Sequence, residues 1–358
     1  MKKVLISSAL AASLAIPSLA FEIYSDDDTK VNLYGSIRGY IGGSYLPQQE
    51  AHSGGYLVGL QNNSQFGMRF SQGNFKANIE FGWIEEGNNP GLRKFWGSYT
   101  TSAGEILFGK TDTPSTDTGF SSNWFNIDNG MQGFGGVYTG NRKAQLQYNV
   151  GGLSLALVSD NYAVGTSSVN EETPRISLGY TIKGEKGAPF FKFAGNYKHL
   201  NGNTPAGYSQ GAAAWDIWAG LRPTFGNAWL SVMVNHGVNA HIYGAQTTLM
   251  NTGGYTHDNV FDSNTSYGAS VKRTGGSLEV GFGLGEKLSL ALGAGYQATY
   301  GGTLGGAAIN GAAGFINLPY KVSANFTFVP QVAYYNTWSG SGVMSSSVLA
   351  AARIKWDF

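Results

Sequence analysis

Residues 348–358 read VLAAARIKWDF, and side chains of two kinds alternate along this stretch. One set is apolar: Val348, Ala350, Ala352, Ile354, Trp356 and Phe358. The last three members of the other set are charged: Arg353, Lys355 and Asp357. Alternation with a period of two is typical of a β-strand whose faces meet different surroundings. The sequence therefore predicts a two-faced strand here, with Phe358 on its apolar face.

The same alternation recurs along the chain, for example in NFKANIEFGW (74–83), PFFKFAGNYK (189–198) and KVSANFTFVPQVAYY (321–335). Short connections are expected near residues 73–74, 102–104, 150–152, 183–187, 223–227, 285–287 and 319–321. Long connections are expected near residues 46–63, 85–91, 111–142, 160–173, 200–211, 238–274, 301–310 and 336–346. Together they join about 16 strands, and the count rises to 18 if the region of residues 267–273 adds to the sheet.

Composition separates this chain from most soluble proteins and from helical membrane proteins. Gly occurs 53 times, Tyr and Phe 20 times each and Trp 8 times, whereas charged residues make up 13%. A charged share of about 25% is usual for soluble domains. A membrane-spanning helix needs about 20 consecutive apolar residues, and the chain after residue 20 has no such run. Cysteine is absent, which excludes disulfides and cysteine metal sites.

Strands with one apolar face favour an all-β fold, and specifically a transmembrane antiparallel β-barrel. Every backbone polar group must be paired inside lipid, so a sheet spans a membrane only when it closes on itself. Lipid then covers the apolar face, and strands of about 10 residues with short turns at one end and long loops at the other fit this architecture. A secreted β-sandwich or propeller is the soluble alternative, but sandwich turns tend to recur every ~8–12 residues.

Residues 1–20 have the features of a secretory signal peptide: a basic start, an apolar stretch and small residues at Ser18-Leu19-Ala20. The barrel domain is then expected to span residues 21–358, and an uncleaved membrane anchor is the alternative. Removal of the two N-terminal lysines changes the net charge from +1 to −1. A nearly neutral chain gives no support for nucleic-acid binding.

Several segments resemble the general porin family of Gram-negative bacterial outer membranes. FEIYSDDDTKVNLYGSIRGYIGG (21–43) is similar to the family's first strand, and RKFWGSYTTSAGEILFGKTDTP (93–114) is similar to its fourth and fifth strands. AQLQYN (144–149) resembles the strand that follows the family's pore loop, and Phe358 resembles the family's terminal phenylalanine. The resemblance covers both ends and the first half of the chain, and it is weak between residues 200 and 310.

The resemblance implies a water-filled porin in the cell outer membrane, with sixteen strands, short periplasmic turns and long extracellular loops. Small hydrophilic solutes and ions would diffuse through it passively. It also implies a homotrimer, contacts with outer-membrane lipid and lipopolysaccharide, and recognition by the barrel-assembly machinery. The third loop, residues 111–142, would fold into the pore so that its acids face basic residues on the wall. A channel selective for sugars or anions is the alternative function.

Alternation assigns the polar side chains of the strands to the lumen, where rings of charge tune ion selectivity. The expected basic wall of the constriction consists of Arg38, Arg69, Lys94, Lys143 and Arg175. The expected acidic loop residues are Asp112, Asp117 and Asp128. Family basic positions align with Ser36, Gln65 and Leu92, so the sign of the ion preference stays open. Barrel closure is expected to involve Phe21, Lys30 and Phe358.

No catalytic, cofactor or metal site is expected. Residues 26–28 are three aspartates that resemble a Ca²⁺ site, but a solvated turn explains them better. The histidines and aspartates of residues 236–262 match no tight metal-site spacing. A barrel enzyme would pair Ser with His on the lipid face, and the histidines are expected in loops or at strand ends. An adhesin would need a passenger domain that the sequence does not contain.

Overall fold

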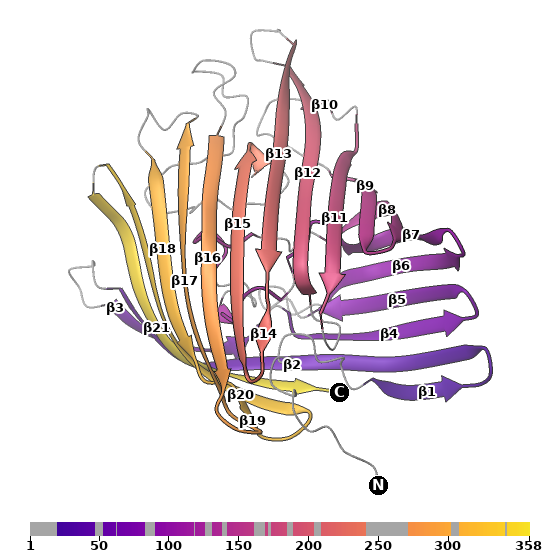
Figure 1. Ribbon diagram of the computed structural model, residues 1–358, viewed down its shortest axis with the longest axis horizontal. Helices are drawn as coiled ribbons and strands as arrows, with labels where there is room; N and C mark the ends of the chain where they lie inside the picture. Colours follow the sequence, from indigo (N-terminus) through magenta and orange to yellow (C-terminus); the bar gives the residue numbers. More distant parts are fainter. Residues whose placement is uncertain are drawn as a thin grey trace.

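A computed structural model gives the structure of the chain. It describes residues 20–46, 53–61, 63–82, 90–117, 119–125, 131–137, 142–160, 169–170, 173–184, 189–203, 209–240, 271–301, 308–340 and 342–358. Within this part of the chain, β-strands form one continuous antiparallel sheet (Figure 1). No helix among the described residues is long and apolar enough to cross a membrane.

The first part of the sheet contains β1 (Phe21–Ser25), β2 (Thr29–Leu46), β3 (Ser53–Leu60), β4 (Gln65–Gln72), β5 (Phe75–Gly82), β6 (Gly91–Thr101), β7 (Gly104–Asp112), β8 (Arg142–Val150), β9 (Leu153–Val158), β10 (Val169–Asn170) and β11 (Arg175–Lys183). The second part contains β12 (Pro189–Asn203), β13 (Ser209–Leu221), β14 (Thr224–Phe225), β15 (Ala228–Val238), β16 (Val271–Gly283), β17 (Ser289–Gly301), β18 (Ile309–Asn317), β19 (Tyr320–Lys321), β20 (Phe326–Ser339) and β21 (Gly342–Asp357).

These segments make a closed barrel of sixteen strands, as the sequence predicts. Several barrel strands are interrupted, so that two segments share one place in the sheet: β3 with β4, β10 with β11, β13 with β14, β18 with β19, and β1 with β21. β2 is the closing position. One edge of β2 pairs with β1 and β21, and its other edge pairs with β3 and β4.

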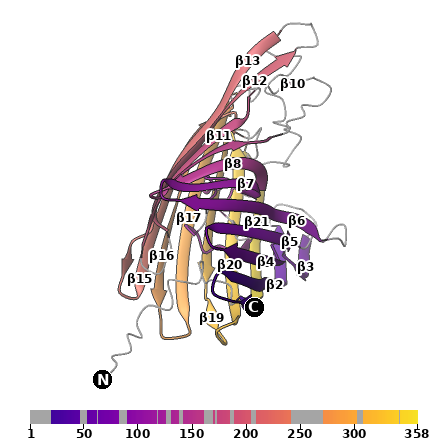
Figure 2. The same ribbon diagram turned by 90° about the vertical axis from the view of Figure 1, so that its right-hand side faces the viewer.

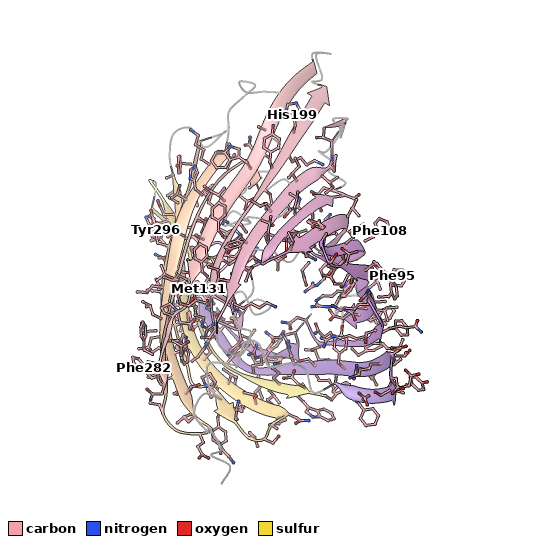
Figure 3. The ribbon with its side chains drawn as sticks, turned by 45° about the vertical axis from the view of Figure 1, so that its right-hand side comes forward. Phe95, Phe108, Met131, His199, Phe282 and Tyr296 are labelled. Atoms are coloured by element: carbon pink, nitrogen blue, oxygen red, sulfur yellow. The ribbon has the colours of Figure 1, made fainter. Side chains whose placement is uncertain are left out.

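The sheet presents apolar side chains outward. On β2, Leu33, Ile37 and Ile41 are exposed, whereas the intervening Tyr34 and Ser36 are buried. Figure 3 shows Phe95, Phe108, Phe282 and Tyr296 pointing away from the barrel on different strands. An apolar outer face is what a lipid-embedded barrel requires, because lipid takes the place of a hydrophobic core.

Turn chemistry explains several tight reversals at one end of the barrel. The β4–β5 turn uses Gly73 at φ 52° and the β14–β15 turn uses Gly226 at φ 62°, a conformation that side chains with a Cβ rarely adopt. The first of these turns lies where the sequence predicts it. The β19–β20 turn instead occupies residues 322–325, so Val322 and Ala324 lie in a turn rather than in the strand expected there.

Several of the long connections expected from sequence are shorter in the structure. β3 occupies residues 53–60, inside the loop predicted for 46–63, because its glycine-rich sequence hides the alternation. β20 ends at Ser339 and β21 begins at Gly342, so the loop predicted for 336–346 is a tight reversal. β12 and β13 rise beyond their neighbours at the end that carries long loops (Figure 1, Figure 2).

Candidate functional site

The barrel lumen holds the polar side chains that alternation directs inward. Arg38 and Lys355 are register partners on β2 and β21, and both face the lumen. The Lys355 Nζ lies 2.8 Å from Asp357 Oδ2. The charge of Arg38 interacts with Arg142 and with Arg353. These groups bring positive charge from several strands onto one side of the pore.

A bulge on β6 adds a further cation to the same side. The β5–β6 register shifts after the pair Glu80 and Lys94, and Arg93 then turns inward together with Lys94. Arg93 Nε lies 2.9 Å from Glu80 Oε1, which is almost fully buried. Alternation alone places Lys94 in the lumen but leaves Arg93 outside it. We call the set Arg38, Arg93, Lys94, Arg142, Arg353 and Lys355 the basic cluster.

Asp112 joins the basic cluster and lies on the wall. It is the last residue of β7, and its carboxylate lies 2.9 Å from Lys94 Nζ and 3.0 Å from Arg142 Nε. Asp112 was expected among the acids of the third loop, facing the basic wall across the pore. The structure brings it instead into direct ion pairs with that wall.

Lys143 and Arg175 share one carboxylate further round the barrel. Arg175 Nε lies 2.6 Å from Asp160 Oδ2, and Lys143 Nζ lies 3.8 Å from Asp160 Oδ1. The Arg175 guanidinium also donates to Asn196 Oδ1 at 3.2 Å, and Arg175 is only 1% exposed. Arg175 is thus enclosed in the wall, whereas Lys143 keeps contact with the lumen.

The other expected residues lie near the short-turn end or near the seam, which is the pairing of β2 with β1 and β21 that closes the barrel. The Arg69 guanidinium carbon lies 4.1 Å from the centre of the Tyr34 ring, in a cation–π contact. At the seam, Phe21 pairs with Leu33 and Lys30 pairs with Ser25. Phe358 N donates to Gly35 O at 3.1 Å, and Gly35 N donates to Phe358 O at 2.8 Å. The terminal residue therefore continues the closing ladder.

The described part of loop 3, the connection between β7 and β8, lies inside the lumen against the inner wall. Its backbone accepts hydrogen bonds from wall side chains: Trp218 Nε1 to Ser115 O (2.9 Å), Lys192 Nζ to Thr116 O (2.6 Å), Asn317 Nδ2 to Ser122 O (2.6 Å), Gln61 Nε2 to Trp124 O (2.8 Å) and Asn235 Nδ2 to Gly135 O (2.7 Å). These donors come from several strands, so the loop is fastened along much of the inner wall. Buried backbone carbonyls are thereby satisfied.

Apolar side chains of loop 3 pack on the same wall. Phe120 packs with Trp218 and Met233, and Met131 packs with Phe315 and Ala333. Figure 3 places Met131 on the inner side of the barrel. Inward-facing apolar residues on these strands were not expected, since alternation predicts a polar lumen throughout. They are covered by the loop, which turns part of the lumen into a packed core.

Glycines on the wall let the loop lie close to the sheet. A Cβ at Gly295 would overlap the Phe134 carbonyl oxygen, and one at Gly179 would overlap the Pro114 carbonyl oxygen. A Cβ at Gly220 would lie 2.7 Å from the Phe120 ring. No side chain fits in these gaps. These glycines on β11, β13 and β17 thus form the surface on which loop 3 rests, here called the glycine bed.

Asp117 is the acidic residue of loop 3 that the structure describes. Burial raises the pKa of Asp117 to about 7, although the charges of Lys192 and Arg222 oppose this shift. Asp128, the other acid expected in this loop, lies outside the described residues. The described acid of loop 3 therefore lies near Lys192 and Arg222 of the wall on which the loop packs, and it is partly protonated near neutral pH.

Among the described residues, no group of three or more His, Asp or Glu side chains could hold a metal ion. Of the loop between β15 and β16, residues 241–270 lie outside the described part. His236 lies within β15, and its Nδ1 is 2.7 Å from Thr274 Oγ1 on the next strand. The histidines were expected in loops or at strand ends, and His236 lies two residues before the end of β15.

Comparison with known proteins identifies the architecture. No protein-family model and no curated protein matches the sequence. The outer membrane channel DcaP of Acinetobacter baumannii matches with a TM-score of 0.65 at 14% identity, over 94% of this chain and 99% of that chain. The anion-selective porin of Comamonas acidovorans matches with a TM-score of 0.60 at 14% identity, over 92% and 100%. OmpT of Vibrio cholerae matches with a TM-score of 0.57 at 13% identity, over 94% and 100%. The chain has the porin fold.

Within the porin fold, sequence reasoning missed residues that lie at irregular positions or at strand ends. Arg93 sits at a bulge and Arg142 begins β8, so neither follows regular alternation. Arg353 and Lys355 were visible in the terminal strand as inward-facing residues. The pairing of the terminal strand with β2 places both residues beside Arg38. This pairing is the signal from which they could have been predicted as constriction residues.

Proposed function

We propose that the protein is an outer-membrane porin through which small hydrophilic solutes and ions diffuse passively, with a preference for anions. One observation carries the preference: four described carboxylates on the basic side of the lumen, Asp112, Asp160, Glu80 and Asp357, each interact with at least two cations. Asp112 contacts Lys94 and Arg142, and Asp160 contacts Lys143 and Arg175. Glu80 and Asp357 interact with Arg38 in addition to their own ion-pair partners, Arg93 and Lys355.

The uncompensated positive charge acts in a narrow space. Low-dielectric walls concentrate its field, so anions are enriched in the pore relative to cations. The carboxyl group of Asp117 on loop 3 adds a negative charge only when it is ionised. The similar fold of the Comamonas acidovorans protein, an anion-selective porin, supports the same preference.

The rest of the proposal is supported by the porin fold and by the sequence resemblance to the general porin family. The protein would reside in the cell outer membrane, after removal of residues 1–20 as a signal peptide. It would contact lipid and lipopolysaccharide, and the barrel-assembly machinery would recognise its terminal strand. It would assemble as a homotrimer, in line with the trimer form of Vibrio cholerae OmpT, whose fold is similar (TM-score 0.55). It would have no cofactor and catalyse no reaction.

Swelling of liposomes that contain the purified protein tests the diffusion function. Neutral sugars of increasing size should enter at rates that fall smoothly with size, because the lumen acts as a sieve. A homotrimer should migrate as one large species before heating and as a monomer afterwards. Failure of every sugar to enter would contradict the proposal. Rapid entry of one sugar and exclusion of smaller ones would support a sugar-selective channel instead.

A further inference from the structure

An aromatic surface adjoins the basic cluster on the same pair of strands. Tyr40 follows Arg38 by two residues on β2, so the two side chains share the inner face. Across the seam, Tyr40 pairs with Arg353 and Arg38 pairs with Lys355. The spacing between successive inward residues is about 7 Å. The Tyr40 ring and the Arg38 guanidinium therefore occupy neighbouring inward positions along the pore.

Loop 3 brings a second ring to the same place. Trp124 is almost fully buried with Val329 and Ala351, and both Tyr40 and Phe125 pack against this group. The Trp124 and Phe125 ring centroids lie 5.7 Å apart. Trp124 thus supports Phe125 from behind, and its own ring is withdrawn from the lumen.

The accessible groups are of two chemical kinds. Tyr40, Phe125, Arg38 and Lys355 are all half-buried, so each keeps part of its surface toward the lumen. Arg353 is almost fully buried, and its guanidinium carbon lies 5.8 Å from the centre of the Trp124 ring. Arg353 therefore contributes charge and holds the loop ring, while Arg38 and Lys355 can meet a solute directly.

We propose that this junction selects, among the anions that enter the pore, small carboxylates that carry a flat apolar ring. A carboxylate would bind Arg38 and Lys355 through charge-assisted hydrogen bonds, and its ring would lie against Tyr40 and Phe125. Arg38 and Tyr40 lie one inward position apart, about 7 Å along the strand, so a small molecule such as benzoate can reach both. The inference rests on the proposed function, since it names the solute class that the anion-preferring channel favours.

Block of chloride current in planar bilayers tests this inference, with benzoate and acetate as the probes. Both carry one negative charge, so the basic cluster alone cannot separate them. The benzoate concentration that halves the current should be about three- to tenfold lower than that of acetate, the gain expected from one ring contact. Cyclohexanecarboxylate, which is equally large but not flat, should fall between them.

Two variants and one control locate the effect. Tyr40→Ser should remove most of the difference between benzoate and acetate while chloride current persists. Tyr45→Ser, on the outer face of the same strand, should retain it. Phe125→Ser changes the loop side of the junction and gives an independent answer if the strand variant does not fold. Equal block by benzoate and acetate in the native protein, or an unchanged ratio in both Tyr40→Ser and Phe125→Ser, overturns the inference. Loss of the proposed function itself would appear differently, as absence of chloride current or of anion preference in the native channel.

Discussion

Gly35 and Phe358 show how single residues close the barrel. The two residues exchange backbone hydrogen bonds at 2.8 Å and 3.1 Å, and the Phe358 ring covers the outer side of Gly35. A Cβ at Gly35 would overlap the ring. Gly35 of the Leu33-Tyr34-Gly35 motif and the terminal Phe358 therefore form one direct contact. The local pattern of neither segment predicts this contact.

Gly35→Ala should destabilise the closed barrel, because the new methyl group overlaps the Phe358 ring. Overpacking of this kind costs about 1–3 kcal/mol, and the temperature at which the folded band is lost on gel electrophoresis should fall. Gly39→Ala is the matched control on the same face of β2, where a Cβ would meet nothing nearer than 3.8 Å. Equal losses in the two variants would show that the ring contact is not responsible.

The charge of Asp117 should make ion preference depend on pH. Burial raises the pKa of its carboxyl group to about 7, so the group is mostly ionised above that pH and mostly neutral below it. Lowering the pH from about 8 to about 6 should remove a negative charge and increase the chloride-to-potassium permeability ratio. Asp117→Asn should weaken this pH response. The same pH response in this variant would assign the titration to another group.

Sequence predicts side-chain direction where strands are regular and fails where they are not. Arg38 and Lys94 face the lumen, as alternation indicates. Arg93 does not follow the alternation, because a bulge depends on how two strands pair rather than on either strand alone. Arg175 lies on the expected face, but its burial by Asp160 and Asn196 depends on tertiary contacts.

Loop 3 and its glycine bed are the element that shapes the pore. The loop lies flat because wall strands offer both hydrogen-bond donors and positions without side chains. Its location inside the barrel was anticipated through the family resemblance. The glycines on which the loop rests were not anticipated, because they are distributed over several strands whose sequences resemble one another. The strand segment β3 was also missed, although Gln61, which follows it, donates a hydrogen bond to the loop.

Gly295→Val should lift loop 3 away from the wall and lower single-channel conductance. The added side chain would overlap the Phe134 carbonyl and the Met131 Cε, which lies 2.6 Å from the position of a Cβ. The loop can move only toward the open part of the lumen. Gly314→Val on neighbouring β18 is the control, since a Cβ there would meet its nearest neighbour at 3.8 Å. Conductance should be unchanged in the control; an unchanged value in Gly295→Val would mean that the loop does not rest on this position.

At the scale of the whole molecule, the barrel has two chemically different inner walls. The described part of loop 3 packs mainly on the wall from β11 to β20 and also reaches β21 and β2 at Trp124 and Phe125, whereas the basic cluster lies on β21, β2, β6 and β8. Alternation and composition were sufficient to predict a closed barrel of about 16 strands. They could not predict this asymmetry, because it arises from which strands the loop covers.

The reversal potential under a salt gradient tests the central claim most directly. The native channel should show a chloride-to-potassium permeability ratio above one. Double reversal of charge, Arg38→Glu with Lys355→Glu, should bring the ratio below one, whereas Lys287→Glu in the exposed β16–β17 turn should leave it unchanged. A native channel that prefers potassium, or one whose ratio does not respond to the double substitution, would contradict the account.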